Sequence, residues 1–392
     1  MSQATTPGLD PRNSFARRVL QDTFAQLGAK LGFLWIGLVA FMAVFAPFIA
    51  SSHPYAMRTA EGWSSPMLAH LSWVDVTMVV TAIACVVAWR WRDKFAVGRL
   101  LLAVIGVAIV VGTISSVTIE PPRAVVFDQY RVGLAQGTIE QAYFAPIPFS
   151  PTDRARDNPK PLQSPDTEHW FGTDENGADV LSRMLHGCRI ALSIGLIATG
   201  IALFIGIVYG GIMGFFGGWL DIALMRFLEI FESIPALFLL LTVVAFFGRD
   251  IYLIMVVIGL TSWPAYARFL RAEFLKLREQ DYIQAALACG LPLRSILFRH
   301  MLPNGVAPLL VGASFGIATA ILAEATLSFL GLGLVDEPSW GGMLNQAVGP
   351  SGTFSLWLAT YPGLAIFFTV FAYNLIGEAL RDAIDPKLDT SS

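Results

Sequence analysis

The carboxylates inside apolar stretches are the side chains of this chain best placed to do chemistry. Glu229 and Glu232 lie in "RFLEIFESIPALF", and Glu324 lies in "AEATLSFLGLGL". A carboxylate within a membrane-embedded segment is costly and usually faces protein or water, so Glu232 and Glu324 could line a path that attracts a cation. For these two residues a structural role is equally open. Glu229 stands one turn from Arg226, which favours an ion pair at a membrane interface.

Other kinds of chemistry have no residue pattern to carry them. The three cysteines, Cys85, Cys188 and Cys289, are scattered, which supports neither a disulfide framework nor a zinc site. A phosphate-binding G-x-x-x-x-G-K-[ST] loop is missing, since none of the five lysines follows a glycine. We therefore expect no catalytic residue, no metal site and no cofactor bound by this chain.

The composition indicates which solvent surrounds the chain. Of its 392 residues 55% are hydrophobic and only 14% are charged, whereas soluble domains carry about a quarter charged residues. The net charge of −3 is small and gives no indication of nucleic-acid binding. Lipid is the expected solvent.

Eight segments are close to the roughly 17–25 apolar residues that a helix needs to cross a bilayer. Pro235 and Pro264 are expected to kink their spans, and the glycines of the fourth span suit close helix packing. The sequence therefore predicts an all-α, polytopic membrane protein. The predicted spans are 31–50, 74–89, 100–119, 190–213, 228–247, 251–267, 306–330 and 356–377.

The distribution of Lys and Arg predicts the orientation. Basic residues gather in the N-terminal segment 1–30, between the second and third spans, in 268–304 and in the C-terminal tail. Short loops with many Lys and Arg stay in the cytoplasm, so both termini are predicted to be cytoplasmic. The segment 120–189 is then the largest external loop, with Cys188 at the external face and Cys289 in a cytoplasmic turn.

Residues 281–304, "DYIQAALACGLPLRSILFRHMLPN", interrupt the apolar spans with small, basic and turn-forming residues. We expect a helix from 266 to 289, with Gly290 just past its end. A shorter helix over 293–301 is expected to end at Pro303-Asn304. Ala285-Ala286 before a glycine turn would make a compact knob that another protein could grip. An ordinary cytoplasmic loop is the alternative.

The spacing in this segment resembles the "EAA" loop of ABC-importer permeases. That loop reads Glu-Ala-Ala, three residues, Gly, nine residues, then x-x-Leu-Pro. Here Gln284 replaces the Glu, so no carboxylate salt bridge is implied at that position. The resemblance implies that the loop couples the permease to an ATPase. The matching coupling residues are Gln284, Ala285, Ala286, Gly290, His300, Leu302 and Pro303.

Further stretches resemble the C-type permease subunit of dipeptide, oligopeptide and nickel importers, and most closely the Yej-type oligopeptide and microcin C permeases. The resemblance covers about residues 30–55 and 140–388. Ala178 stands where the family often has Arg, and the second and third spans, about 71–119, look like an insertion into a six-span core. The matching stretches are "FAPFIA" (45–50), "APIPFS" (145–150), "FGTDENGADVLSRMLHGCRIALSIGL" (171–196), "GGWLDIALMR" (217–226), "AEATLSFLGLGL" (323–334), "PSWGGML" (338–344) and "GEALRDAIDPKL" (377–388).

The resemblance implies a domain layout along the chain. Residues 1–30 form a cytoplasmic segment, and 31–119 hold the first core span and the two inserted spans. An external loop follows over 120–189. The permease core occupies 190–388 and contains the cytoplasmic coupling loop 268–304.

The resemblance also implies a function and partners. The chain would be the permease subunit of an ATP-driven peptide importer in the bacterial inner membrane, with ATP bound by partner subunits. Those partners would be a B-type permease, two ATP-binding subunits and an external substrate-binding protein. One alternative is a proton-coupled secondary transporter using Glu232 and Glu324, although no inverted repeat is evident. A membrane-embedded enzyme is the other, and it lacks a cluster of reactive residues.

Overall fold

The computed structural model describes residues 15–60, 62–91, 95, 97–119, 126–154, 160–334, 337–349 and 354–384. Predictions for residues 1–14 of the N-terminal segment and for the end of the core, 385–388, lie outside these residues. Parts of the loop 120–189 and of the basic loop between the second and third spans lie outside them as well.

Among the described residues, seven helices are long and apolar enough to cross a membrane, or eight if a bent pair counts as one span. This confirms the prediction of an all-α, polytopic protein. The long helices are α2 (Leu27–Ile49), α4 (Trp73–Arg90), α5 (Val97–Thr118), α7 (Val180–Phe216), α10 (Ile251–Arg278), α13 (Leu302–Leu327) and α15 (Leu356–Ile384).

The remaining elements are short and carry the connections. Three strands form an antiparallel sheet in the order β2-β1-β3, with Arg58 opposite Trp63 on one side and Gln141 on the other. The strands are β1 (Ala56–Thr59), β2 (Gly62–Ser64) and β3 (Gln141–Tyr143). The helices are α1 (Phe15–Ala25), α3 (Pro66–Ala69), α6 (Gln129–Ala135), α8 (Gly218–Glu232), α9 (Ala236–Phe247), α11 (Asp281–Ala288), α12 (Leu293–Ser295) and α14 (Trp340–Ala347), with π-helical turns η1 (Ile296–Met301) and η2 (Ser328–Leu332).

The chain divides into two compact units. Unit 1 comprises Met1–Gly37, Ser193–Leu327 and Ile366–Ser392, and unit 2 comprises Leu38–Leu192 and Ser328–Ala365. Unit 1 therefore contains most of the predicted permease core together with the 281–304 segment. Unit 2 contains the inserted helices and the polar connections.

In unit 1 the glycines of α7 let it approach α10 closely. A Cβ on Gly206 would lie 2.5 Å from the Cβ of Tyr266, and one on Gly210 would overlap the backbone of Ala267. Small residues at such positions allow helix backbones to pack in lipid, where no hydrophobic force drives association. The predicted role of these glycines is confirmed at both positions, whereas Gly200 has nothing within 4 Å.

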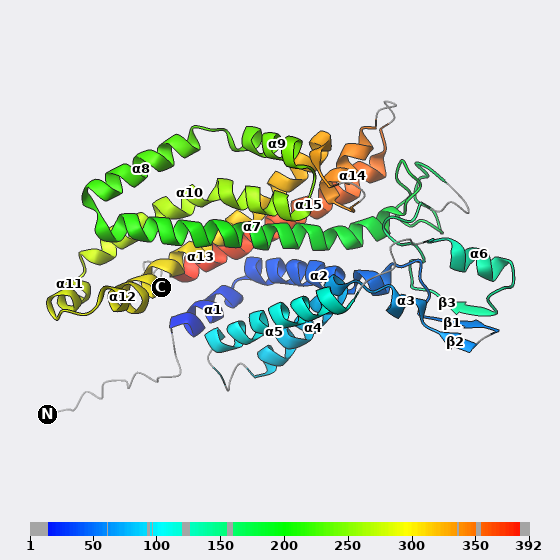
Figure 1. The fold of residues 1–392 in the computed structure, drawn as a ribbon, viewed down its shortest axis with the longest axis horizontal. Helices are drawn as coiled ribbons and strands as arrows, with labels where there is room; N and C mark the ends of the chain where they lie inside the picture. Colours follow the sequence, from blue (N-terminus) through cyan, green and yellow to red (C-terminus); the bar gives the residue numbers. More distant parts are fainter. Residues whose placement is uncertain are drawn as a thin grey trace. The chain divides into compact units, whose positions relative to one another are not determined.

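The predicted span 228–247 is not one continuous helix. Its residues belong to α8 and α9, which meet at an angle of 68° (Figure 1). Pro235 stands at the break, where it cannot donate a backbone hydrogen bond and its ring obstructs a continuing helix. Pro264, which was also expected to kink a span, lies inside α10, and that helix continues to Arg278.

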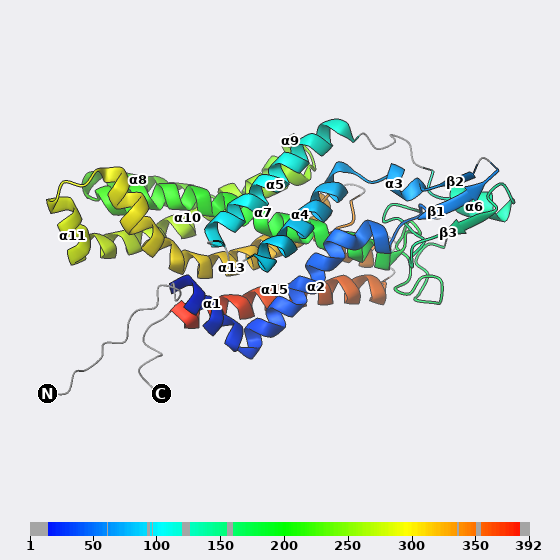
Figure 2. The ribbon, with the colours of Figure 1, turned by 90° about the horizontal axis from the view of Figure 1, so that it is seen from below.

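One boundary of unit 2 also differs from the expectation. The fourth long helix, α7, begins at Val180 rather than at 190, so the polar loop after the third span ends about ten residues earlier than predicted. The inserted helices α4 and α5 pack side by side (Figure 2), and few of their side chains are buried. Asp75 lies in the first turn of α4 and forms a capping box with Ser72.

Candidate functional site: the 281–304 segment and the bent helix

The 281–304 segment begins with a helix break that the sequence did not reveal. The predicted helix 266–289 is two helices, since α10 ends at Arg278 and α11 begins at Asp281. Gln280 between them has an extended backbone (φ −75°, ψ 140°). The side-chain amide of Gln284 donates a hydrogen bond of 2.8 Å to the Arg278 carbonyl at the end of α10. A carboxylate could not donate this bond, which gives Gln284 a local reason to replace Glu.

Gly290 ends α11 as predicted. Its φ is +70°, a left-handed conformation that glycine adopts without steric cost. The Leu291 N–H donates to the Ala286 carbonyl at 3.2 Å, and the Gly290 N–H donates to the Leu287 carbonyl at 3.0 Å. These two bonds define a Schellman motif, which satisfies the last carbonyls of a helix and reverses the chain.

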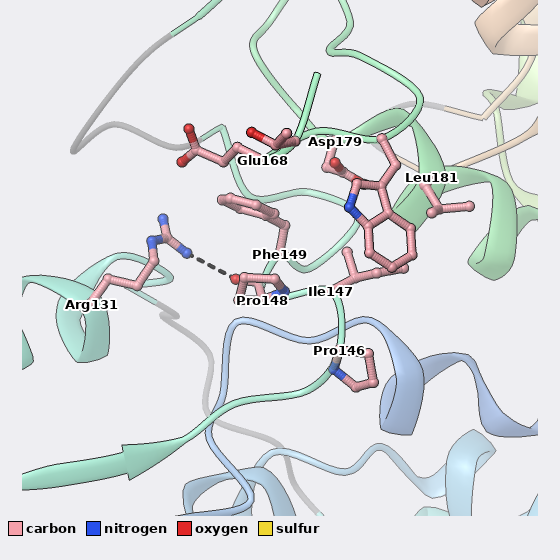
Figure 3. A pocket seen from close by; sticks show the side chains of 10 residues that line it. Arg131, Pro146, Ile147, Pro148, Phe149, Glu168, Asp179 and Leu181 are labelled. Carbon is pink, nitrogen blue, oxygen red and sulfur yellow. Dashed lines mark hydrogen bonds between the residues drawn. The ribbon is translucent and has the colours of Figure 1, made fainter. Parts of the chain in front are cut away.

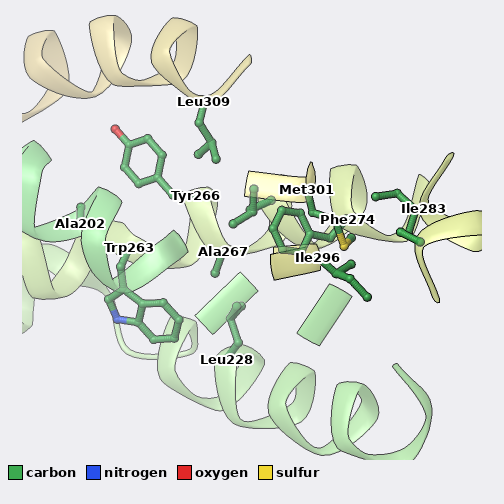
Figure 4. Packing of buried hydrophobic residues seen from close by; sticks show 12 residues of the cluster. Ala202, Leu228, Trp263, Tyr266, Ala267, Phe274, Ile283, Ile296, Met301 and Leu309 are labelled. Atoms are coloured by element: carbon green, nitrogen blue, oxygen red, sulfur yellow. The ribbon is translucent and has the colours of Figure 1, made fainter. Parts of the chain in front are cut away.

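Four buried side chains fix the segment to the rest of unit 1. Ile283, Ala286, Ile296 and Met301 belong to an apolar cluster that also contains Phe274 of α10. Figure 4 shows Phe274, Ile296 and Met301 gathered together. The predicted Ala285-Ala286 pair is therefore divided, because Ala286 is buried in this cluster and Ala285 is exposed. Close packing of this kind holds a short helical turn in one position.

The C-terminal end of the segment does not stop where the sequence predicted. The π-helical turn η1 continues into α13, so the chain remains helical through Pro303 and Asn304. Pro303 is the second residue of α13, and a proline in a first helical turn is tolerated because its missing N–H is not needed there. His300 and Leu302 are half-buried, Pro303 is exposed, and the Asn304 side chain donates to the His300 carbonyl at 2.7 Å.

Large apolar side chains cover the outer surface of the same segment. Phe298 is 69% exposed. Sequence reasoning singled out the alanines and the glycine and missed these residues, although the periodicity of "LRSILF" places Phe298 and Ile296 on different faces. Exposed apolar patches of this kind mark contacts with a partner. The exposed apolar residues are Tyr282, Leu287, Leu291, Leu293 and Phe298.

Ion pairs tie the bent helix to α10. Asp221 of α8 accepts two hydrogen bonds from the Arg271 guanidinium, at 2.5 and 2.6 Å. Glu232, the last residue of α8 before the break, pairs with Arg268. A two-pronged arginine–carboxylate contact fixes orientation as well as distance. Sequence reasoning missed Asp221, Arg268 and Arg271. The aspartate in the family-like stretch "GGWLDIALMR" and the arginines of α10 could have indicated these ion pairs.

The three carboxylates in apolar stretches occupy different environments. Glu229 pairs with Arg226 at 2.5 Å, which confirms the predicted ion pair. Glu232 is not a buried residue within a continuous span, since it is partly exposed at the end of α8 beside Arg268. Glu324 lies in α13 and is only 3% exposed. The structure thus gives Glu232 a cationic partner and places Glu324 in the interior of unit 1.

Comparison with known proteins adds the family. Residues 206–390 match the family described as "Binding-protein-dependent transport system inner membrane component". The dipeptide transport system permease protein DppC of Alkalihalophilus pseudofirmus is 38% identical over 63% of this chain and 81% of its own length. The oligopeptide transport system permease protein OppC of Haemophilus influenzae is 39% identical over 62% of this chain and 78% of its own length.

Two further matches complete the comparison. The glutathione transport system permease protein GsiD of Pectobacterium atrosepticum is 40% identical over 58% of this chain and 75% of its own length. A solved structure of the MetNI methionine ABC transporter aligns with 52% of this chain and 97% of its own chain, at 18% identity and a TM-score of 0.44. From the family match and the extent of these relatives, the chain belongs to the binding-protein-dependent transport system inner membrane components and is a multi-pass permease subunit of an ABC importer.

Proposed function

We propose that this permease imports peptides and forms one half of a translocation pathway with a B-type permease subunit. The relatives named for dipeptide, oligopeptide and glutathione transport support a peptide cargo. The resemblance to Yej-type oligopeptide and microcin C permeases stays a prediction about cargo within this class. An external substrate-binding protein would deliver the cargo, as the family's description implies.

ATP would be bound by two separate subunits, because this chain has no phosphate-binding loop and we expect it to bind no cofactor. The distribution of Lys and Arg supports a bacterial inner-membrane protein with both termini in the cytoplasm. In that orientation the 281–304 segment faces the ATP-binding subunits.

One observation carries the coupling proposal, namely the apolar outer surface of the 281–304 segment. Phe298 and its exposed neighbours sit on a turn whose inner side is packed into unit 1. A turn that is fixed on one side and apolar on the other suits insertion into a groove of another protein. The predicted coupling residues Gln284, Ala285 and Gly290 are exposed on the same segment.

A route for the motion is also present in unit 1. The segment packs on α10 through Phe274, and α10 holds α8 through Arg271 and Arg268. The break between α8 and α9 follows Glu232 directly. Closure of the ATP-binding subunits would therefore move α10 and, through the ion pairs, change the bend at Pro235.

The second candidate, a proton-coupled secondary transporter, would need Glu232 and Glu324 to exchange protons. Glu232 is already paired with Arg268, and a proton site there would have to break that pair. Glu324 stays a candidate for lining the path because it is buried inside unit 1. The ion pair of Glu232 favours the ATP-driven reading.

Variants of the segment test the coupling proposal. Gly290→Val places a β-branched residue at φ +70°, whereas Gly290→Asn suits that backbone. No heavy atom lies within 4 Å of a Cβ at this position, so only the backbone distinguishes the two variants. In the reconstituted importer we expect Gly290→Val to lose ATP-driven peptide uptake at least tenfold, by a shift of about 1.4 kcal/mol or more in the coupled state. Gly290→Asn should retain uptake.

Phe298→Ser tests the surface separately, since this side chain is mostly exposed and its loss leaves the packed side intact. We expect less ATP-binding subunit to co-purify with the permease. Wild-type uptake and co-purification by both Gly290→Val and Phe298→Ser would refute the coupling role of this segment.

A further inference from the structure

A pocket of about 300 Å³ lies in unit 2, in a region that the coupling mechanism does not use. It belongs to the polar module, which we define as residues 50–72, 126–154 and 160–179 where described. Its walls come from residues 146–149 and from the side chains of Arg131, Thr167, Glu168, Trp170, Asp179 and Leu181. Figure 3 shows Arg131 on one side of Phe149 and Leu181 on the other.

The floor of the pocket is apolar. Ile147 and Phe149 are buried, and Pro146, Pro148 and Leu181 complete the lining between them. Proline and aromatic surfaces of this kind accept apolar side chains and extended peptide backbone, because neither requires a hydrogen bond from the wall. The floor thus selects hydrocarbon or an aromatic ring.

Trp170 stands on the rim and is 58% exposed. An indole ring is among the side chains that gain most from burial, and stacking on a second ring adds to that gain. Thr167 lies beside it in the lining and is also exposed. A large aromatic side chain held at the mouth of an apolar pocket is arranged to cover a ligand.

Charged groups flank this apolar surface. The Arg131 guanidinium lies 5.1 Å from the centre of the Phe149 ring and donates to the Pro148 carbonyl at 3.2 Å and to Asp153 at 2.7 Å. Glu168 accepts from Lys160 at 2.5 Å and is about half exposed. Arg131 is therefore largely satisfied, whereas the Glu168 carboxylate can still accept from a ligand ammonium group.

We propose that this pocket binds one aromatic or large apolar side chain of a short peptide, with the peptide's amino group toward Glu168. The choice of a peptide rests on the proposed function, whereas the choice of an aromatic side chain rests on the pocket. Its volume is at the lower end of the range for small-ligand pockets. A stable protein–protein contact buries about 1,000 Å² or more, which a pocket of this size cannot provide.

Part of the pocket wall comes from a stretch of the chain that lies outside the family resemblance. Arg131 lies in α6, in the stretch between residues 56 and 139 that has no counterpart in the resemblance. Its contacts with Pro148 and Phe149 attach that added stretch to a family-like one. The added stretch thereby completes a wall of the pocket.

Ligand-observed NMR on the intact importer tests the proposal, without ATP and without binding protein. The probe is the tripeptide Ala-Phe-Ala with free termini, and Ala-Ser-Ala is the matched control peptide. We expect saturable binding of Ala-Phe-Ala, with the strongest saturation transfer at the phenyl protons, and none of Ala-Ser-Ala. N-acetylation of Ala-Phe-Ala should weaken binding severalfold by removing the ammonium group.

Three variants identify the pocket as the site. Trp170→Ala should raise the Kd about three- to tenfold, and Leu181→Trp should abolish binding by filling the pocket. Trp63→Ala removes an equally exposed tryptophan on β2, away from the lining, and should bind as the wild type does. Subunit assembly, measured on each variant, separates loss of binding from loss of fold.

Several results would overturn the inference. These are absence of saturable binding to the wild type, unchanged binding by Leu181→Trp, or a Trp170→Ala variant that loses only its affinity for the binding protein. The assay does not depend on transport, so Phe298→Ser should bind Ala-Phe-Ala normally. Failure of the coupling proposal and failure of the pocket proposal therefore give different results.

Discussion

In the 281–304 segment the fully buried side chains are apolar, whereas in the polar module many of them are charged or hydrogen-bonding. Ile283, Ile296 and Met301 hold the segment against α10. In the polar module the buried Ser52 hydroxyl donates to Asp153 at 2.5 Å, and the same carboxylate receives Arg131. The two regions are therefore ordered by different forces.

The difference has a physical reason in each region. A turn that must be gripped from outside needs a rigid inner side, and close apolar packing gives rigidity without fixing any particular orientation of charge. The polar module has a small sheet and little apolar area to bury, so directional bonds supply its order. The comparison predicts that the segment responds to lost volume, and the module to lost or altered charge.

The largest expected effect is a volume change in the segment. Ile283→Ala removes a fully buried side chain and should cost about 2–5 kcal/mol of stability. We expect the thermal midpoint of the purified importer to fall and the ATP-binding subunits to dissociate. Arg294→Ala shortens an exposed side chain of the same segment, outside the apolar surface, and should change stability by less than about 0.5 kcal/mol. Equal effects of the two variants would break the comparison.

The second largest effect is expected from removing the carboxylate partner of Arg189 in unit 2. Arg189 of α7 donates to Asp75 of the inserted helix α4 at 2.5 Å and to the Ala43 carbonyl at 2.6 Å. If residues 71–119 were only an insertion into a six-span core, their deletion would leave a core that assembles. The ion pair predicts instead that deletion leaves the mostly buried Arg189 guanidinium without its carboxylate partner, which should cost about 3 kcal/mol of folding stability.

Adding Arg189→Gln to the deletion tests this directly. The double change removes the stranded charge, so the yield of assembled complex should recover relative to the deletion alone. Recovery would show that the insertion is peripheral apart from one ion pair. Failure of both variants to assemble would mean that α4 and α5 are required for the core itself.

The polar module should also weaken in acid. The pKa of His53 is lowered to about 4, mainly by burial and also by the stacked ring of His70, while Asp153 opposes the shift. The unfolded chain binds this proton below about pH 6.5, whereas the folded module does not, so stability falls as the pH drops from 6.5 to 4. At pH 5 the loss should be about 2 kcal/mol.

Hydrogen exchange of residues 126–154, corrected for intrinsic pH effects, measures this loss. His53→Gln should remove most of the slope, while His70→Gln serves as the matched control on the other ring of the stack. Exchange in the 281–304 segment, which is held by hydrocarbon, should not follow the same slope. An unchanged slope in His53→Gln would assign the acid sensitivity to another group.

The smallest effect on the protein is expected from a single cysteine substitution that reports the membrane topology. Cys188, expected to report the external face, is buried in the structure and therefore cannot serve, whereas Cys289 is exposed. Ala135→Cys on the exposed surface of α6 supplies a replacement. On intact cells an impermeant thiol reagent should modify Ala135→Cys and spare Cys289 until the membrane is opened. Modification of Cys289 from outside would reverse the proposed orientation.

Much of the fold could be predicted from the sequence because the bilayer imposes a length on every span. The apolar segments, the all-α class and the end of α11 at Gly290 follow from local patterns. The break between α8 and α9 could not be placed, since a proline predicts a kink and not its angle. The 68° bend depends on what α8 packs against, including the Asp221–Arg271 pair.

For the candidate site the sequence identified the segment but not which of its side chains face outward. Spacing alone determined that residues 284–303 form a family-like loop and that Gly290 turns the chain. Only the tertiary structure decided that Ala286 faces inward, that Phe298 faces outward and that Gln284 closes the end of α10. Local patterns record backbone preference, whereas the direction of a side chain depends on partners such as Phe274, which are distant in sequence.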